Sequence, residues 1–137
     1  MNKKGPIVII EDDVDDQELI REMFSELNLP NEVLIFPDGE SALEYLSGPE
    51  VYPFLIISDI KMPKMDGFEL RDMLSKKSKQ LRATPFLFFT TGGTPQSLSS
   101  AYGMSVQGVF QKPVRFNEWK QTMQSIVQYW NSCLAPI

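Results

Sequence analysis

The stretch from Phe54 to Gly67, FLIISDIKMPKMDG, decides the fold of this chain. Its first four residues are apolar, include β-branched side chains and show no alternation, which is typical of a strand buried on both faces of a parallel sheet. Asp59 falls where this strand should end, and the carboxyl ends of strands form the ligand crevice in open α/β sheets. Pro63 and the pair Asp66–Gly67 predict a loop before the next helix. The stretch therefore predicts a buried strand that delivers one acid to a candidate site.

Outward from this stretch, apolar runs and helical spacing alternate along the chain. We expect strands at Ile7–Ile10, Glu32–Phe36, Phe54–Ile57, Phe86–Phe89 and Val106–Gln111. We expect helices at Asp15–Leu27, Ser41–Leu46, Gly67–Lys79, Thr94-Pro95 to about Gly103, and Phe116–Trp130. Asp38 and Thr94 are the expected caps of two of these helices. Alternating strands and helices indicate an α/β fold, a doubly wound, five-stranded parallel sheet with helices on both faces.

Composition narrows the functional classes. A chain of 137 residues with 42% hydrophobic content predicts one domain with its core at about residues 5–131, and no output domain. There is no apolar run of about 18 residues, the start MNKKGPIVII does not resemble a signal peptide, and there is one cysteine, so we expect a cytoplasmic location. The net charge of -5 argues against binding to nucleic acid or anionic membranes. The absence of histidine excludes Ser-His-Asp and Cys-His catalysis and histidine metal sites.

Chemically active side chains follow four of the five strands. Glu11 and Asp12 follow the first strand, Asp59 the third, Thr90 the fourth and Lys112 the fifth. All of these strand ends should meet at one edge of the sheet, where three carboxylates would repel one another unless a cation lay among them. A hard divalent ion, Mg²⁺ or Mn²⁺, suits such oxygen ligands, and a lysine with a hydroxyl suits a phosphoryl group. Together these groups describe an aspartyl-phosphate site.

Four short motifs make the sequence resemble the receiver domains of two-component response regulators. They are IVIIEDD (residues 7–13), SDIKMPKMDG (58–67), FFT (88–90) and QKP (111–113), in the order and approximate spacing of the family. The set spans nearly the whole chain and is specific, although each motif alone is weak. The resemblance implies the CheY-like (βα)5 variant of the flavodoxin-like fold, with strand order 2-1-3-4-5. It also implies a phospho-accepting signalling domain, not an enzyme, that assists its own phosphorylation and dephosphorylation.

The resemblance implies a role for each residue of the phosphoryl site. Asp59 would accept a phosphoryl group from a phosphohistidine of a sensor histidine kinase or a histidine phosphotransfer protein. Thr90 would donate a hydrogen bond to the phosphoryl group, and Lys112 would form an ion pair with it. The Lys112–Pro113 peptide bond is usually cis in this family, so we expect a cis bond here.

The resemblance also implies the ligands of the metal ion. Glu11 and Asp12 would form the acidic pair at a Mg²⁺ (or Mn²⁺) site, with Asp12 the more direct ligand. Asp59 would complete the carboxylate set, and Lys61 would contribute its backbone carbonyl.

Two features depart from the family pattern. Many receivers carry Tyr or Phe three residues before the lysine, whereas this chain has Val109 there and Phe110 one place later. A shift of one residue along a strand points the side chain to the other face, so we expect the aromatic switch to be missing or altered. Gly92 and Lys61 occupy the two positions that influence dephosphorylation in the family, and they do not predict the lifetime of the phosphoryl group.

Several charged or aromatic residues have simpler interpretations. Asp13, Asp15, Asp16 and Glu18 would stabilise a helix N-terminus through the helix dipole. Thr91 reads as an ordinary loop residue. The basic run of Lys76, Lys77, Lys79 and Arg82 reads as a solvated helix end. Trp130 is expected to pack, with exposure to a partner as the alternative.

The sequence is compatible with four functions. The first is a single-domain signalling receiver, acting either as a diffusible messenger or as a relay to a second histidine protein. The second is a phosphatase like the haloacid dehalogenases, which would need an acid where this chain has Lys61. The third is a flavodoxin-like flavin carrier, whose phosphate loop would not carry the acids of residues 11–13. The fourth is a receiver-like module that binds partners without phosphorylation, which Val109 keeps open.

We expect the partner surface on the fourth helix, the fifth strand and the last helix. It would include parts of Ser97–Gly103, Gly108–Phe110 and Phe116–Met123, and phosphorylation would shift a pre-existing equilibrium there. The target is an unknown protein. We expect no nucleic acid or membrane partner, and a monomer or weak dimer.

Overall fold

The computed structural model describes residues 1–136 and shows a single five-stranded sheet in which every strand pairing is parallel. The strand order is β2-β1-β3-β4-β5, which confirms the predicted fold class. The strands are β1 (Ile7–Ile10), β2 (Val33–Phe36), β3 (Leu55–Asp59), β4 (Phe86–Thr90) and β5 (Gly108–Gln111). Asp59 and Thr90 are thus the last residues of their strands, slightly further along than predicted.

Six helices lie within residues 1–136, one more than predicted. They are α1 (Val14–Leu27), α2 (Gly39–Leu46), α3 (Gly67–Lys77), α4 (Lys79–Ala83), α5 (Pro95–Gly103) and α6 (Phe116–Ser132). The predicted helix to Lys79 was wrong at its end, because Ser78 has extended backbone angles that interrupt it. The Ser78 side chain accepts a hydrogen bond from the Leu81 amide and caps α4. A serine favours this capping position over a helix interior.

The predicted caps of two other helices are confirmed. The Asp38 side chain accepts a hydrogen bond from the Ser41 amide at 2.7 Å at the start of α2. Thr94 forms a capping box with Ser97, and Pro95 is the first residue of α5. These caps satisfy amide groups that have no partner inside the helix.

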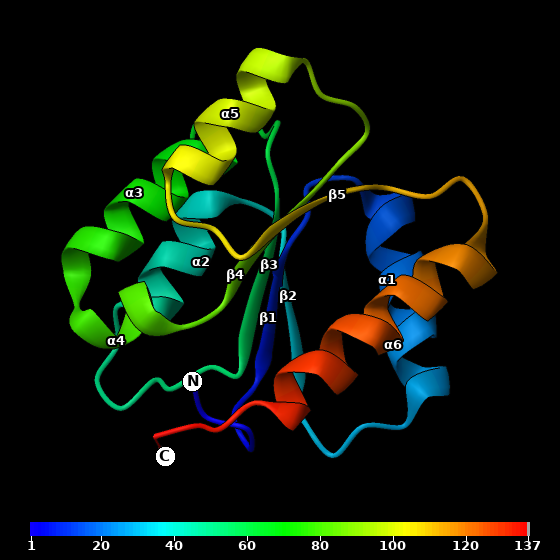
Figure 1. Ribbon diagram of the computed structural model, residues 1–137, viewed down its shortest axis with the longest axis horizontal. Coiled ribbons are helices and arrows are strands. Elements are labelled where there is room, and N and C mark those ends of the chain that lie inside the picture. The colour runs from blue at the N-terminus through cyan, green and yellow to red at the C-terminus, as the bar shows by residue number, and fades with distance from the viewer. Residues whose placement is uncertain (137) are drawn as a thin grey trace.

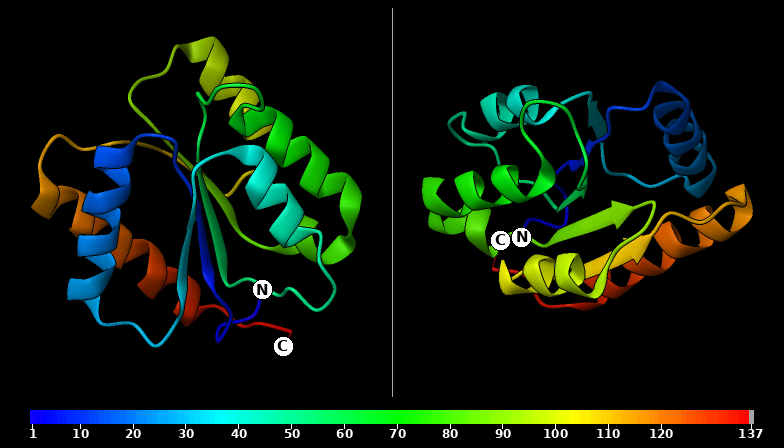
Figure 2. Two further views of the ribbon diagram at one scale, coloured as in Figure 1. Left: turned by 180° about the vertical axis from the view of Figure 1, so that it is seen from behind. Right: turned by 90° about the horizontal axis from the view of Figure 1, so that it is seen from above.

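The helices cover both faces of the sheet (Figure 1). α1 and α6 lie on one side, and α2, α3, α4 and α5 lie on the other, which the views from behind and above also show (Figure 2). Successive residues of each central strand therefore enter different cores. Ile7 and Ile9 pack with α1 and α6, whereas Val8 and Ile10 pack with α2 to α5. Burial on both faces explains the continuous apolar runs of the sequence.

The Lys112–Pro113 peptide bond is trans, as are all peptide bonds in the described residues, so the expectation of a cis bond was wrong. A trans bond is the more stable form before proline by about 0.5–1 kcal/mol. Among residues 1–136, no helix has the length and apolar character needed to cross a membrane.

Candidate functional site

The predicted site residues meet at the carboxyl edge of the sheet. β1 leads directly into Glu11 and Asp12, β3 ends at Asp59, and β4 ends at Thr90. Lys112 follows β5, and its amide donates to the Thr90 carbonyl at 2.7 Å, which continues the ladder between these strands. The central strands are thus aligned so that their polar ends share one edge, as the sequence predicted.

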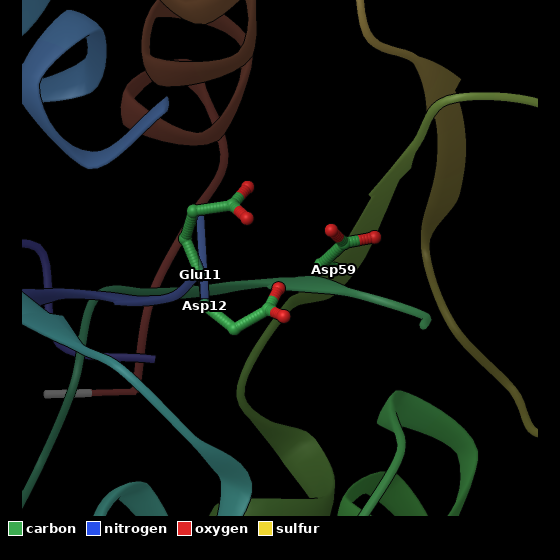
Figure 3. A group of neighbouring side chains, drawn as sticks. All are labelled: Glu11, Asp12 and Asp59. Atoms are coloured by element: carbon green, nitrogen blue, oxygen red, sulfur yellow. The ribbon is translucent and has the colours of Figure 1, made fainter. Parts of the chain in front are cut away.

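Glu11, Asp12 and Asp59 form an acidic cluster, and each offers an oxygen within 4.8 Å of the others. Figure 3 shows the three carboxylates around one space, two from the end of β1 and one from β3. Glu11 is buried, Asp59 is 9% exposed, and Asp12 is exposed. The donors are all carboxylate oxygens, with one side open to solvent, and this set fits a hard divalent cation.

The two carboxylate oxygens of Asp59 have different partners. Oδ1 accepts a hydrogen bond from the Ile60 amide at 2.7 Å, and Oδ2 accepts one from Lys112 Nζ at 2.9 Å. A backbone donor and a side-chain cation therefore fix the orientation of the carboxylate. The Asp59 carboxylate is thus held in one orientation at the carboxyl edge of the sheet.

Lys112 lies among three carboxylates. Its Nζ is 2.6 Å from Glu11 Oε1, 2.9 Å from Asp16 Oδ2 and 2.9 Å from Asp59 Oδ2, and its side chain is 6% exposed. Burial lowers the pKa of the ammonium, but the hydrogen bonds to the three carboxylates outweigh burial and raise the pKa overall. Lys112 is therefore a permanently charged group at neutral pH, with a fixed position.

The contact between Lys112 and Asp16 was not predicted. Asp16 was interpreted as a helix-dipole residue, and it does lie in the first turn of α1. Its partner is 96 residues away in the sequence, so local spacing carried no signal that separates the two roles. Its neighbours Asp13 and Asp15 behave as expected, since Asp13 caps α1 and Asp15 is exposed in the first turn.

Burial raises the pKa of the Glu11 carboxyl to about 7, although the adjacent Lys112 acts in the opposite direction. Glu11 is only 2% exposed, and Oε2 also accepts a hydrogen bond from the Asp13 amide. Without a further cation, the folded protein thus holds Glu11 in an environment that disfavours its charged form.

Thr90 is buried, and its hydroxyl donates to the Gly92 carbonyl at 3.0 Å. This bond ties the end of β4 to the loop that leads into α5. The site therefore contains a hydroxyl whose present acceptor is the protein's own backbone.

The loop after β3 is held close to the site by Gly67. The Gly67 amide donates to the Ile60 carbonyl at 2.7 Å, and a Cβ at Gly67 would lie 2.4 Å from the Asp59 carbonyl oxygen. Only glycine permits this close approach.

The side chain of Lys61 is exposed in this loop. A cleft of about 540 Å³ lies between this loop and the end of β4, lined by residues that include Ile60, Lys61, Met62, Phe68, Thr90 and Gly92.

Val109 and Phe110 lie on opposite sides of β5, as predicted. Val109 packs with the core under α2 to α5, and Phe110 packs with the core under α1 and α6. The Phe110 ring is stacked on Phe89, with 5.2 Å between the centroids. No aromatic side chain therefore occupies the usual switch position of β5.

Comparisons with known proteins agree with this arrangement. A sequence profile of the response regulator receiver domain matches residues 7–124. The probable methanogenesis regulatory protein FilR2 of Methanothrix harundinacea (strain 6Ac) is 32% identical over 128 residues, which cover 90% of this chain and 82% of that protein.

Two solved structures show the same fold. The phosphorylated cyanobacterial phytochrome response regulator RcpA is 26% identical, with a TM-score of 0.86 and coverage of 97% of this chain and 99% of that one. The Mn²⁺-bound form of response regulator Rcp1 is 24% identical, with a TM-score of 0.80 and coverage of 96% and 97%. The second likeness concerns the fold alone.

Proposed function

Because the chain belongs to the response regulator receiver domain family of two-component signalling, we propose that it is a phosphorylation-switched signalling domain with Asp59 as its phosphoacceptor. Family membership confirms the resemblance seen in the sequence. The observation that carries the proposal is the Asp59 carboxylate at the end of β3, oriented by the Ile60 amide and by the buried ammonium of Lys112.

In the proposed reaction, a carboxylate oxygen of Asp59 attacks the phosphorus of a phosphohistidine. An O–P bond forms as the P–N bond breaks, and the electron pair of the broken bond leaves on the imidazole nitrogen. Lys112 would pair with the transferred phosphoryl group, since it is charged and already 2.9 Å from Asp59. Thr90 would exchange its bond to the Gly92 carbonyl for one to a phosphoryl oxygen.

A Mg²⁺ or Mn²⁺ ion would be held by Glu11, Asp12, Asp59 and the backbone carbonyl of Lys61. The three clustered carboxylates support this, as does the Mn²⁺-bound form of Rcp1, which has the same fold. When bound, the ion would neutralise negative charge between the acids and the incoming phosphoryl group. It would also offset the burial that raises the pKa of Glu11.

The output surface would be the face of α5, β5 and α6. A groove of about 650 Å³ between β5 and α6 supports this, with apolar lining that includes Leu87, Phe110, Ile126, Tyr129 and Trp130. Tyr129 is 63% exposed there, and Trp130 is partly exposed, which fits its alternative interpretation as a partner contact. The Thr90–Gly92 bond would connect this face to Asp59 through the loop before α5.

The phosphodonor would be a sensor histidine kinase or a histidine phosphotransfer protein, and the target another protein. Both a messenger and a relay fit this site. We propose a cytoplasmic location and a monomeric or weakly dimeric state, without nucleic acid or membrane partners.

A second candidate function is partner binding without phosphorylation. The observation that favours it is Val109 at the switch position, with Phe110 stacked on Phe89 on the other side of the strand. Under this alternative, Asp59→Asn would bind the target as tightly as the wild type treated with phosphodonor.

Intact-mass measurement after incubation with Mg²⁺ and acetyl phosphate tests the proposed function. We expect one added phosphoryl mass in the wild type and none in Asp59→Asn. Asp66→Asn is the control, because it changes an acid of the adjacent loop outside the acidic cluster. If no adduct forms and beryllofluoride (a phosphoryl mimic) does not bind either, the proposal is wrong.

A further inference from the structure

Lys112 has three carboxylate partners, but only two of them belong to the acidic cluster. Glu11 and Asp59 contact both the ammonium and the space that a cation would occupy. Asp16 contacts the ammonium at 2.9 Å and lies outside that cluster. The three acids around Lys112 are therefore not equivalent.

The two shared acids place Lys112 in competition with a divalent cation. A lysine ammonium has three N–H donors, and here each of the three carboxylates can take one. A cation held by Glu11 and Asp59 weakens their attraction for Lys112. The lysine side chain is 6% exposed, so water cannot replace the carboxylates as partners of the ammonium. An ammonium that loses these partners would have to leave its buried position.

Asp16 provides a partner that a cation at the acidic cluster does not take away. Its side chain is 19% exposed, less than its exposed neighbours on the first turn of α1. It extends from the first turn of α1 to a lysine that follows β5. No other cation contacts Asp16 in the described residues.

We propose that Asp16 is a positioning residue that holds Lys112 beside Asp59 while Glu11 and Asp59 bind a divalent cation. The inference rests on the proposed function, since it assigns Lys112 to the phosphoryl group and the acids to the ion. Asp16 acts entirely through Lys112. Asp16 lets the site contain a bound cation and a buried ammonium together.

The test is the dissociation constant for Mg²⁺ alone, measured by calorimetry on the full chain without phosphodonor. In Asp16→Asn, Lys112 keeps a hydrogen-bond acceptor but loses a compensating charge, so it stays on Glu11 and Asp59 and competes with the ion. We expect affinity for Mg²⁺ to fall about tenfold, as for other residues that support a ligand set. Asp15→Asn removes the same charge from the same turn without contacting Lys112, and we expect less than about a twofold change.

A double-mutant cycle shows whether the effect passes through Lys112. In the Lys112→Met background, Asp16→Asn should change the dissociation constant no more than Asp15→Asn does. Equal effects of the two aspartate variants in the wild-type background would overturn the inference. So would an Asp16→Asn effect that persists undiminished without Lys112.

The proposed function and this inference fail differently. A wild type that binds Mg²⁺ but neither accepts a phosphoryl group nor binds beryllofluoride contradicts the proposed function, while the double-mutant cycle still measures the Asp16–Lys112 contact. A wild type that is phosphorylated while Asp16→Asn binds Mg²⁺ normally contradicts only the inference. Asp16→Ser, a second small polar residue suited to a helix start, repeats the test, and circular dichroism checks that each variant is folded.

Discussion

The chemistry of the site depends on where individual charges are buried. Lys112 balances carboxylates that would otherwise repel one another, and Glu11 is the most buried of them. Both side chains are buried, so water does little to stabilise their charges. Removing either one therefore changes both the stability of the fold and the electrostatics of the site.

Lys112→Met should destabilise the protein in the absence of divalent cations, because it leaves Glu11 and Asp59 buried without their cation. Breaking one side of such a pair typically costs about 3 kcal/mol. Urea unfolding in the presence of a chelator measures the change. Lys120→Met is the matched control, since its pair with Glu26 is partly exposed (30% and 42%) and should contribute less than about 1 kcal/mol. Equal losses in the two variants would contradict the assigned role of Lys112.

Glu11 should make stability depend on pH in the cation-free protein. Its carboxyl titrates near 4.5 in the unfolded chain and near 7 in the folded protein. Between these values the unfolded chain has released a proton that the folded protein keeps, so stability falls as pH rises from about 4.5 to 7 and levels off above. In Glu11→Gln this contribution is absent. Parallel curves of unfolding free energy against pH for the two proteins would rule out the raised pKa.

At the residue scale, the sequence predicted which side chains meet but not all of their contacts. Glu11, Asp12, Asp59, Thr90 and Lys112 follow strands of a parallel sheet, so topology alone brings them to one edge. Asp16 lies on a helix, and its contact with Lys112 depends on how α1 packs against the sheet. Local sequence does not encode that packing angle, which is why a helix-dipole role seemed sufficient.

At the scale of elements, the apolar runs predicted the strands well because both faces of the sheet are buried. The break between α3 and α4 was not predicted, because the helical spacing of apolar residues continues past Ser78. A serine is also a common helix cap, but the prediction followed the spacing. The trans bond before Pro113 was missed because the expectation came from the family and not from the residues of this loop.

The junction of β3 and α3 should be intolerant of substitution at Gly67. A Cβ there would meet the Asp59 carbonyl at 2.4 Å and the Phe88 ring at 2.7 Å. We expect Gly67→Ala to lower the free energy of unfolding by about 2 kcal/mol. We also expect it to slow phosphorylation, because the added methyl group would displace the backbone of Asp59. Gly103→Ala, where nothing lies within 4 Å of the added carbon, is the control. A fully stable, fully active Gly67→Ala would show that this close approach is unimportant.

For the whole molecule, the question is how a change at Asp59 reaches the face of α5, β5 and α6. Two hydrogen bonds of the structure mark one path. Thr90 ties the end of β4 to Gly92, and the Tyr102 hydroxyl of α5 accepts a hydrogen bond from the Val109 amide of β5 at 3.2 Å. Release of the first bond would loosen the start of α5 against β5.

Thr90→Ala should allow occupation of the phosphoryl site at Asp59 but weaken the structural change in α5 and β5. With Mg²⁺ and beryllofluoride, amide chemical shifts of the wild type should change around Asp59 and across α5 and β5. In Thr90→Ala, the changes around Asp59 should remain while those in α5 and β5 shrink. Thr91→Ala, which alters the exposed neighbouring threonine, should behave as the wild type. Unchanged shifts in α5 and β5 for the wild type would favour the phosphorylation-independent module.

The most direct test of the account locates the phosphoryl group on the chain. After incubation with Mg²⁺ and acetyl phosphate, borohydride reduces an aspartyl phosphate to homoserine, and peptide mass spectrometry then reads the position. We predict homoserine at residue 59 alone, dependent on Mg²⁺. Homoserine at Asp12, Asp16 or another acid, with residue 59 unmodified, would contradict the central claim that Asp59 is the phosphoacceptor.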